Sequence, residues 1–273
     1  MRAGAGAFTL TGMTDTPVPA VPRPAATILL VRDDPAFEVL MVKRHHQIDF
    51  ASGALVFPGG KLHAGDHDPA WATRALGWET TAPPERPLRI AAIREAYEET
   101  GILLGRHPDG SHFAGSAHAA AARDDVAMDR RAFLDLVAAA DVCLDLTALT
   151  TFAHWIAPAM APKRFDTMFY IAAAPPDQLA VCDGYETVDA EWIAPAEALR
   201  LRAAGERTVI FPTRMNLQLL AEASDALDAV ARASARTLVT VEPTVIQRPD
   251  GPHMTIQSDA GYGAVAVPLA DLN

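Results

Sequence analysis

The chain has 273 residues, of which 50% are hydrophobic and 21% are charged, so it carries enough apolar surface for a packed core and is not disordered as a whole. Its 34 acidic side chains exceed its 23 basic ones, for a formal net charge of −11. That balance argues against a nucleic-acid coat and against a polybasic membrane anchor.

The sequence also lacks the marks of a membrane or secreted protein. Its early apolar runs fall well short of the ~18 residues that a membrane span needs, and the first two dozen residues lack the continuous apolar core of a secretory signal. Cys143 and Cys182, the two cysteines, lie far apart, which excludes a disulfide scaffold and suits a reducing compartment. We therefore expect a cytoplasmic protein in which both cysteines are buried.

Residues 1–24 are expected to form a polar tail, and Met13 is an alternative start to Met1. Two aliphatic runs, within residues 25–34 and 37–44, flank Asp, Asp and Pro turn residues and predict a β-hairpin. Residues 54–57 predict a short strand that ends in a glycine turn at Pro58-Gly59-Gly60.

Residues 61–87 have weak periodicity and are interpreted as an inserted surface loop with one short helix near residues 70–76. We expect that shortening this loop spares the fold. A helix then begins at Arg86-Pro87, because Ile90, Ile93 and Tyr97 recur at the spacing of a core-facing stripe. Gly101 is expected to end that helix as a residue able to adopt a positive φ.

The rest of the chain alternates strand and helix patterns and shows no fixed repeat, whereas residues 105–125 show no clear period. The order predicts an α/β fold with a mixed central sheet covered by helices. The predicted segments are a helix near 132–137, strands at 149–158, 164–172 and 191–193, helices at 195–199 and 212–235, and strands within 237–268 around a turn at 249–251.

Three carboxylates, those of Glu95, Glu98 and Glu99, share one face of the helix that begins at Arg86. Such a cluster repels itself, and oxygen-rich clusters suit Mg²⁺ or Mn²⁺. The alternative is a solvated glutamate-rich face, which is common on amphipathic helices. Two features favour the metal site: Arg94 is placed to orient a carboxylate, and a strand ending in glycines lies upstream. We expect this face of the helix to point to solvent and metal.

These residues resemble the Nudix hydrolase signature, which reads G-x5-E-x7-R-E-U-x-E-E-x-G-U with U a bulky aliphatic residue. Its second half matches Arg94, Glu95, Glu98, Glu99, Gly101 and Ile102, with Ala96 as a small U residue. In the first half, Gly60 is followed after five residues by Asp66 instead of glutamate, and 27 residues instead of seven separate Asp66 from Arg94. Asp66 is the weakest correspondence, since it could be a loop residue aligned by accident.

An interrupted box resembles the Nudix branch that includes the peroxisomal coenzyme A diphosphatases of animals and bacterial relatives. Residues 50–60, 152–158, 162–167 and 183–187 are similar to segments of that branch. The resemblance implies a Nudix-type α/β/α sandwich over residues 25–236, with an insertion at about 61–87 and an extra C-terminal helix and strands. Residues 237–273 are expected to be a strand extension packed on the same domain.

The resemblance also implies hydrolysis of a nucleoside diphosphate linked to another moiety, with Mg²⁺ or Mn²⁺ bound by Glu95, Glu98 and Glu99. Coenzyme A or an acyl-CoA is the expected substrate, and ADP-ribose, NDP-sugars or dinucleotides are the alternative. Glu98, Glu99 and Glu186 are the candidates for the general base. A ligand-binding or regulatory domain without turnover is the alternative of another class, favoured by Asp66 and the long insertion.

An anionic substrate needs local positive charge, for which Arg44, Lys163 and Arg164 are candidates, beside Lys43 and Lys61. Surface solubility is the competing explanation for each. His45, His46 and His154 have no metal-binding spacing and are expected to be structural or exposed, and the four tryptophans are expected to be anchors of the core or its loops. We expect a small-molecule nucleotide-diphosphate substrate, and neither nucleic acid nor membrane as a partner.

Overall fold

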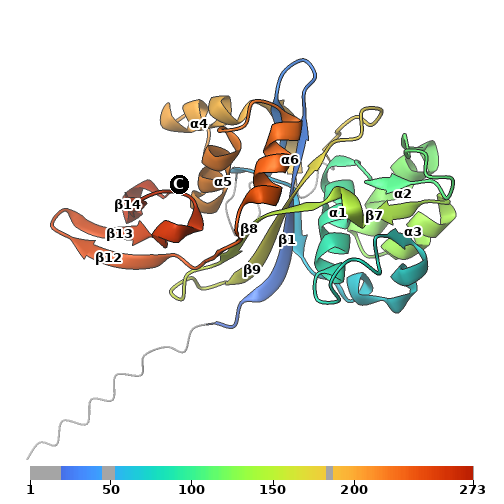
Figure 1. Cartoon of the computed structure of the whole chain (residues 1–273), viewed down its shortest axis with the longest axis horizontal. Helices are drawn as coiled ribbons and strands as arrows, with labels where there is room; N and C mark the ends of the chain where they lie inside the picture. The colour runs from blue at the N-terminus through green and yellow to red at the C-terminus, as the bar shows by residue number, and fades with distance from the viewer. Residues whose placement is uncertain (1–19, 45–52, 183–186, 273) are drawn as a thin grey trace, which may run out of the picture.

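The computed structural model describes residues 20–44, 53–182 and 187–272, and a mixed β-sheet forms its centre (Figure 1). The strand order is β10-β2-β1-β9-β8-β11, with β3 on β2 and β4 on β1. The pairs β1/β9 and β8/β11 are parallel and the others are antiparallel. The strands are β1 (Arg23–Arg32), β2 (Glu38–Arg44), β3 (Leu55–Val56), β4 (Gly59–Lys61), β8 (Thr150–Ile156), β9 (Phe165–Ala173), β10 (Thr187–Ile193) and β11 (Thr240–Val241).

Helices cover both faces of this sheet, α1 to α3 on one side and α4 to α6 on the other (Figure 1). Alternate residues of β1 feed the two cores: Ile28 and Leu30 pack with α1, whereas Leu29 and Val31 pack with α5 and α6. The predicted α/β/α sandwich is confirmed. The helices are α1 (Arg86–Thr100), α2 (Ala117–Ala127), α3 (Phe133–Ala139), α4 (Pro195–Ala203), α5 (Phe211–Leu220) and α6 (Ala226–Ala235).

The predicted hairpin is confirmed as β1 and β2, but the predicted glycine turn is wrong. Gly59 and Gly60 belong to strand β4, which pairs antiparallel with β1 opposite Thr27 and Ala26. Neither glycine has a positive φ. They are needed for close approach, because a Cβ at Gly59 would collide with the Thr27 side chain and the β1 backbone.

The single helix expected over residues 212–235 is two helices, α5 and α6, separated by residues 221–225. The break follows from capping groups: the Asp225 side chain accepts the Asp228 N–H at 2.8 Å, and the Asp33 carboxylate accepts the Ala226 N–H at 2.9 Å. These carboxylates satisfy the free amides at the start of α6, so a new helix begins there.

Helix α2 is missing from the sequence prediction, although its core face does repeat. Ala119, Ala122 and Val126 are its buried residues, and Ser116 caps it by accepting the Ala119 N–H at 3.1 Å. Because alanine dominates every face of this segment, its sequence carries little amphipathic contrast.

The segment 61–87 lies mostly at the surface, and the short helix predicted near residues 70–76 is present as a 3-10 helix, but the rest is more ordered than the predicted loop. It contains two 3-10 helices, Ala64–His67 and Pro69–Thr73, and a strand β5 (Ala75–Leu76) that pairs with β7 (Cys143–Asp145), which in turn pairs with β6 (Gly105–Arg106). Trp71 is 1% exposed, packs on Phe133 with ring centroids 5.7 Å apart and donates its Nε1–H to the Gly65 carbonyl.

We expect Trp71→Ala to reduce the free energy of unfolding by about 3–5 kcal/mol, because it leaves a cavity where the insertion meets α3. Denaturant unfolding measures this loss. Trp78→Ala is the control, since Trp78 is only half-buried and its ring lies beneath the Arg86 guanidinium. Equal stability of the two variants would show that the insertion packs only loosely on the domain.

The C-terminal segment forms the predicted strands around a turn at Pro249-Asp250-Gly251. They are β12 (Thr244–Arg248), β13 (Gly251–Thr255) and β14 (Ala266–Pro268), and two short 3-10 helices, Ser258–Ala260 and Leu269–Asp271, accompany them. Met254 and Ile256 bury their side chains in the core beside α5 and α6. A further 3-10 turn, Leu146–Ala148, precedes β8.

The two cysteines are less buried than the sequence predicts. Cys143 and Cys182 are free thiols, but both are half-buried and not buried, because they lie on the small β5-β7-β6 sheet and in a loop outside the main core. Over the described ranges, none of the helices combines the length and apolarity that crossing a bilayer requires.

Candidate active site

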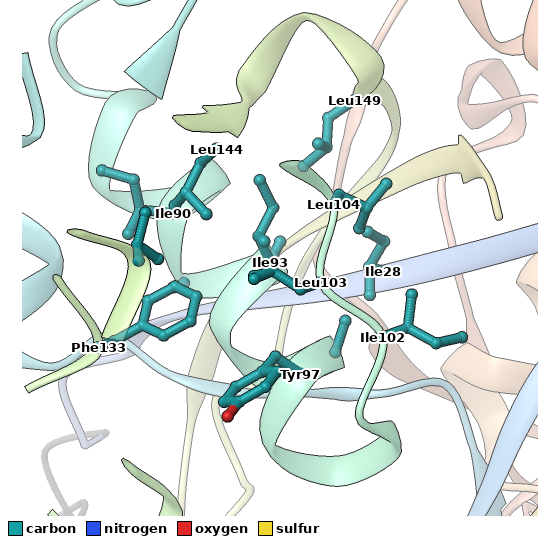
Figure 2. Packing of buried hydrophobic residues seen from close by; sticks show 14 of the residues in the cluster. Ile28, Ile90, Ile93, Tyr97, Ile102, Leu103, Leu104, Phe133, Leu144 and Leu149 are labelled. Carbon is teal, nitrogen blue, oxygen red and sulfur yellow. The ribbon is translucent and has the colours of Figure 1, made fainter. Parts of the chain in front are cut away.

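Helix α1 carries the carboxylates and is held rigidly in the sandwich. Pro87 lies in its first turn, and Gly101 ends it with φ 78° while its N–H donates to the Tyr97 carbonyl. The predicted stripe of Ile90, Ile93 and Tyr97 is confirmed as its core face, which packs among side chains of β1, α3, β7 and the segment after α1 (Figure 2). A helix fixed on this side presents a well-defined array of side chains on its other side.

Glu95, Glu98 and Glu99 lie on that other side, and they are 6%, 8% and 5% exposed. The expectation that they point to solvent is therefore wrong. The face is covered because β4 and the 3-10 helix Ala64–His67 pack against α1. Buried carboxylates need compensating charge or hydrogen bonds.

Arg94 supplies most of that compensation. Its Nη1 donates to Glu95 Oε1 at 2.8 Å and to Glu98 Oε2 at 2.9 Å. Its Nε and Nη2 form a fork on Asp66, at 2.9 Å to Oδ1 and 3.0 Å to Oδ2, and Nη2 also donates to the Lys61 carbonyl at 2.9 Å. One guanidinium thus ties three carboxylates to β4 and the inserted segment.

The charges at this cluster are only partly balanced. Burial raises the pKa of Glu98 to about 8, against the opposing influence of Arg94. Burial alone would lower the pKa of Arg94, but the charge of Glu95 and the bonds to Asp66 outweigh it and hold that pKa above its ordinary value. The site is therefore rich in acidic groups and short of positive charge.

Asp66 is part of this site, and the doubt that the sequence left about it is removed. It is 2% exposed, and besides binding Arg94 it accepts the His63 N–H at 2.7 Å. The available signal was spacing, since five residues separate Gly60 from Asp66 as the signature requires. Aspartate is shorter than glutamate, and the 3-10 helix brings its backbone close enough to reach Arg94.

Glycines let the strand β4 lie against the carboxylates. The Gly59 N–H donates to Glu99 Oε2 at 3.2 Å. A Cβ on Gly60 would overlap the carboxylate of Glu95, well inside van der Waals contact. Gly60 therefore leaves the space in which the Glu95 carboxylate sits.

We expect Gly60→Ala to lower kcat/KM by roughly tenfold or more, because the added methyl must displace the Glu95 carboxylate. Gly65→Ala is a matched control, since a Cβ there meets nothing within 4 Å. Steady-state kinetics on the same substrate measure both variants. Unchanged kinetics in Gly60→Ala would mean that the position of Glu95 does not matter to turnover.

Of the basic candidates, Lys61 lies at the Arg94 cluster, since its carbonyl accepts from Arg94 Nη2. Arg164 donates to the carbonyls of Ala157 and Ala20 and forms an ion pair with Glu242 at 2.5 Å, and Lys163 precedes it just before β9. Arg44 ends β2, and its side chain lies outside the described part of the chain, as does the whole of Glu186.

The structure also shows where the tryptophans and His154 lie. Trp71 and Trp155 are buried, whereas Trp78 and Trp192 are half-buried against the core, so their role as anchors is confirmed. His154 joins three strands, through Asp166 Oδ1 at 2.5 Å and Thr240 Oγ1 at 2.8 Å, as expected of a structural histidine. His45 and His46 lie outside the described residues.

No group of three or more His, Cys, Asp or Glu side chains has the arrangement of a metal site among residues 20–44, 53–182 and 187–272. Oxygens of Glu95 and Glu98 face Arg94, and one of Glu99 faces the Gly59 amide. The donors themselves are those that hard divalent cations prefer, namely several carboxylates on one rigid helix. The donor chemistry therefore fits a divalent cation.

Comparison with known proteins links this geometry to a family. A family model described as the NUDT19 Nudix domain matches residues 72–218, more than half of the chain. The acyl-coenzyme A diphosphatase NUDT19 of Homo sapiens is 28% identical over 287 residues, covering 88% of this chain and 76% of that protein. The Gallus gallus protein of the same name is 28% identical over 302 residues, covering 88% and 79%.

Solved structures agree with the fold. The crystal structure of a NUDIX hydrolase from Alicyclobacillus acidocaldarius is 27% identical, with a TM-score of 0.69. The match covers 81% of this chain and 97% of that one. The similarity therefore extends over most of this chain.

Proposed function

Because the chain belongs to the NUDT19 Nudix domain family and is a Nudix hydrolase, we propose that it cleaves the diphosphate bond of coenzyme A or an acyl-CoA. The products are 4′-phosphopantetheine, or its acyl form, and adenosine 3′,5′-bisphosphate. Water adds to one phosphorus, the bridging oxygen leaves with the other phosphate, and the proton of the water passes to a base.

The observation that carries the proposal is the Arg94 cluster on α1. Glu95 and Glu98 are held at 2.8 and 2.9 Å by a guanidinium that Asp66 fixes from the opposite side. Arg94 and Asp66 act as positioning residues, since they order the carboxylates and leave the chemistry to them. A scaffold without turnover has no need of this buried acidic cluster, which opposes folding through repulsion and desolvation.

We propose that Glu95, Glu98 and Glu99 hold Mg²⁺ or Mn²⁺. Such a cation would neutralise charge on the diphosphate and promote attack by water. The three glutamates supply the negative charge and the oxygen donors, and their burial keeps competing water away. Glu98, Glu99 and Glu186 are the candidates for the base that accepts the proton.

The adenosine 3′-phosphate and the diphosphate need cations, for which we propose Arg44, Lys163 and Arg164. The Arg164 guanidinium already binds Glu242 and two backbone carbonyls, so a substrate phosphate would compete with the Glu242 carboxylate.

We further propose that the active domain spans residues 25–236, that residues 237–273 extend it, and that the protein is cytoplasmic. The net charge of −11 supports a small-molecule substrate over nucleic acid or membrane.

The test is product chromatography with coenzyme A, several acyl-CoA esters, ADP-ribose, an NDP-sugar and a dinucleoside polyphosphate, each at the same concentration. We expect the highest kcat/KM with a CoA compound, and adenosine 3′,5′-bisphosphate among its products. A higher kcat/KM for ADP-ribose or the NDP-sugar would overturn the substrate while leaving the hydrolase assignment in place.

Removal of divalent cations by a chelator is expected to abolish turnover, and Mg²⁺ or Mn²⁺ in excess should restore it, because the diphosphate and the glutamates repel each other without a cation. Activity assays before and after dialysis measure this. The chelator should leave the far-ultraviolet circular dichroism unchanged, since Arg94 holds the cluster together. Full turnover after exhaustive chelation would contradict the proposed site.

A further inference from the structure

A pocket of about 500 Å³ lies on the face of the sheet opposite to α1. Helices α4 and α5 form one wall, and the segment that leads into β14 forms the other. Its apolar lining includes Leu199, Met215, Tyr262, Val265 and Val267. The pocket is an open groove in which these apolar side chains lie beside polar groups, and its volume can hold part of a small organic ligand.

Two arginines line this pocket, and no carboxylate of the described residues lies within 4.0 Å of them. Arg214 on α5 is only 9% exposed, and Arg202 on α4 is half-buried. Both donate to a single oxygen, the carbonyl of Asp271, at 2.6 Å from Arg202 Nη2 and 3.5 Å from Arg214 Nη1. The Nε atom of each is buried and lacks a hydrogen-bond partner.

This arrangement differs from that of Arg94, which meets three carboxylates. Among residues 20–44, 53–182 and 187–272 neither Arg202 nor Arg214 has an ion pair within 4.0 Å. Burial lowers the pKa of Arg214 and the positive charge of Arg202 lowers it further, against the opposing charge of Asp271. Two like charges that share one carbonyl in a half-apolar pocket destabilise the fold, unless an anion joins them.

We propose that this pocket is a second ligand site, in which Arg202 and Arg214 bind the oxyanion head of an amphiphilic molecule whose apolar body lies against Met215, Val265 and Val267. The forked guanidinium groups match a carboxylate or a phosphate monoester, and each keeps N–H donors on its Nη atoms besides the one that binds the Asp271 carbonyl. The apolar lining excludes a bare inorganic anion as the best ligand, because such an ion would leave that surface uncovered.

This site is separate from the proposed active site. The Arg94 cluster is on the α1 face, whose core contains Ile28 and Leu30, whereas α4 and α5 belong to the face of Leu29 and Val31 (Figure 1). Binding in the pocket can therefore be measured without turnover, and its outcome does not depend on which diphosphate the enzyme cleaves.

The experiment uses the full chain without divalent cations and measures binding by calorimetry and by the shift in melting temperature. The probes are octanoate, octyl phosphate, inorganic phosphate and the neutral octanol. We expect octanoate, octyl phosphate or both to bind and to raise the melting temperature, and phosphate alone and octanol to bind at least about tenfold more weakly. Binding by only one of the two amphiphiles supports the site and identifies the head group.

The variants Arg202→Gln and Arg214→Gln are each expected to weaken binding by about tenfold or more, as for the loss of one charge-assisted hydrogen bond. Without ligand, both variants should melt at or above the wild-type temperature, because a repelling charge is removed. Arg200→Gln is the matched control: it lies on the same helix, is exposed and pairs with Glu197, so it should bind like the wild type.

Three results would overturn the proposal. The first is that octanol binds as well as octanoate, and the second is that no probe binds. The third is that the double variant, Arg202→Gln with Arg214→Gln, binds as the wild type does. If the variants melt well below the wild type and also bind normally, the arginines serve the fold through the Asp271 carbonyl and not a ligand.

Discussion

Glu98→Gln and Glu99→Gln are each expected to lower kcat by about 10² or more, since each removes a charged oxygen donor from the proposed cation site. Glutamine keeps the shape of the side chain and an acceptor oxygen. Arg94 can still donate to position 98 and the Gly59 amide to position 99, so the loss reflects charge and not geometry. Steady-state kinetics with saturating Mg²⁺ and then Mn²⁺ measure the effect.

The fold should survive both substitutions. Burial raises the pKa of Glu98 to about 8, so its carboxylate is charged only above that pH. There the neutral glutamine removes a repelling charge and should slightly raise the melting temperature of the metal-free protein. Glu197→Gln, an exposed glutamate on α4, is the control and should retain full activity. Turnover near the wild-type level in both active-site variants would refute the assignment of the site.

Arg94→Met is expected to reduce the free energy of unfolding of the metal-free protein by about 3–5 kcal/mol, because it leaves Asp66, Glu95 and Glu98 buried without their shared cation. The loss should be smaller at about pH 5 than at about pH 8. Glu98, whose pKa burial raises to about 8, is protonated at the lower pH, and its unfavourable charge appears as the pH rises through that value. Urea unfolding at the two pH values measures both effects.

A double variant separates the charge effect from lost packing. Arg94→Met combined with Glu98→Gln should be more stable than Arg94→Met alone, since one of the unpaired carboxylates is neutral. Arg86→Met, at the half-buried start of the same helix, is the control and should change stability by about 1 kcal/mol or less, since Arg86 donates to a carbonyl and not to a carboxylate. If adding Glu98→Gln restores none of the lost stability, Arg94 stabilises the fold by packing and not by charge.

Much of the candidate site could be predicted because it is local in the chain. Arg94, Glu95, Glu98 and Glu99 lie within six residues, and helical spacing alone brings their side chains to one face. The stripe of Ile90, Ile93 and Tyr97 predicted which side of α1 is buried in the core, and Gly101 predicted where the helix ends. The two-core sandwich followed from alternating strand and helix patterns together with the family resemblance.

The segments that the sequence analysis misread are those whose structure depends on distant partners. Residues 61–87 show no period because Trp71 packs on Phe133 and β5 pairs with β7, each some 60 to 70 residues away along the chain. The break before α6 depends partly on Asp33, which caps a helix 193 positions later.

Sequence by itself determined the chemistry of the site: which carboxylates stand together, and that an arginine accompanies them. Only the tertiary structure decided that they are buried, that Asp66 joins them across the insertion, and that Gly60 leaves room for Glu95. The physical reason is that helical periodicity is a local property, whereas burial and ion pairing depend on which surfaces the fold brings together.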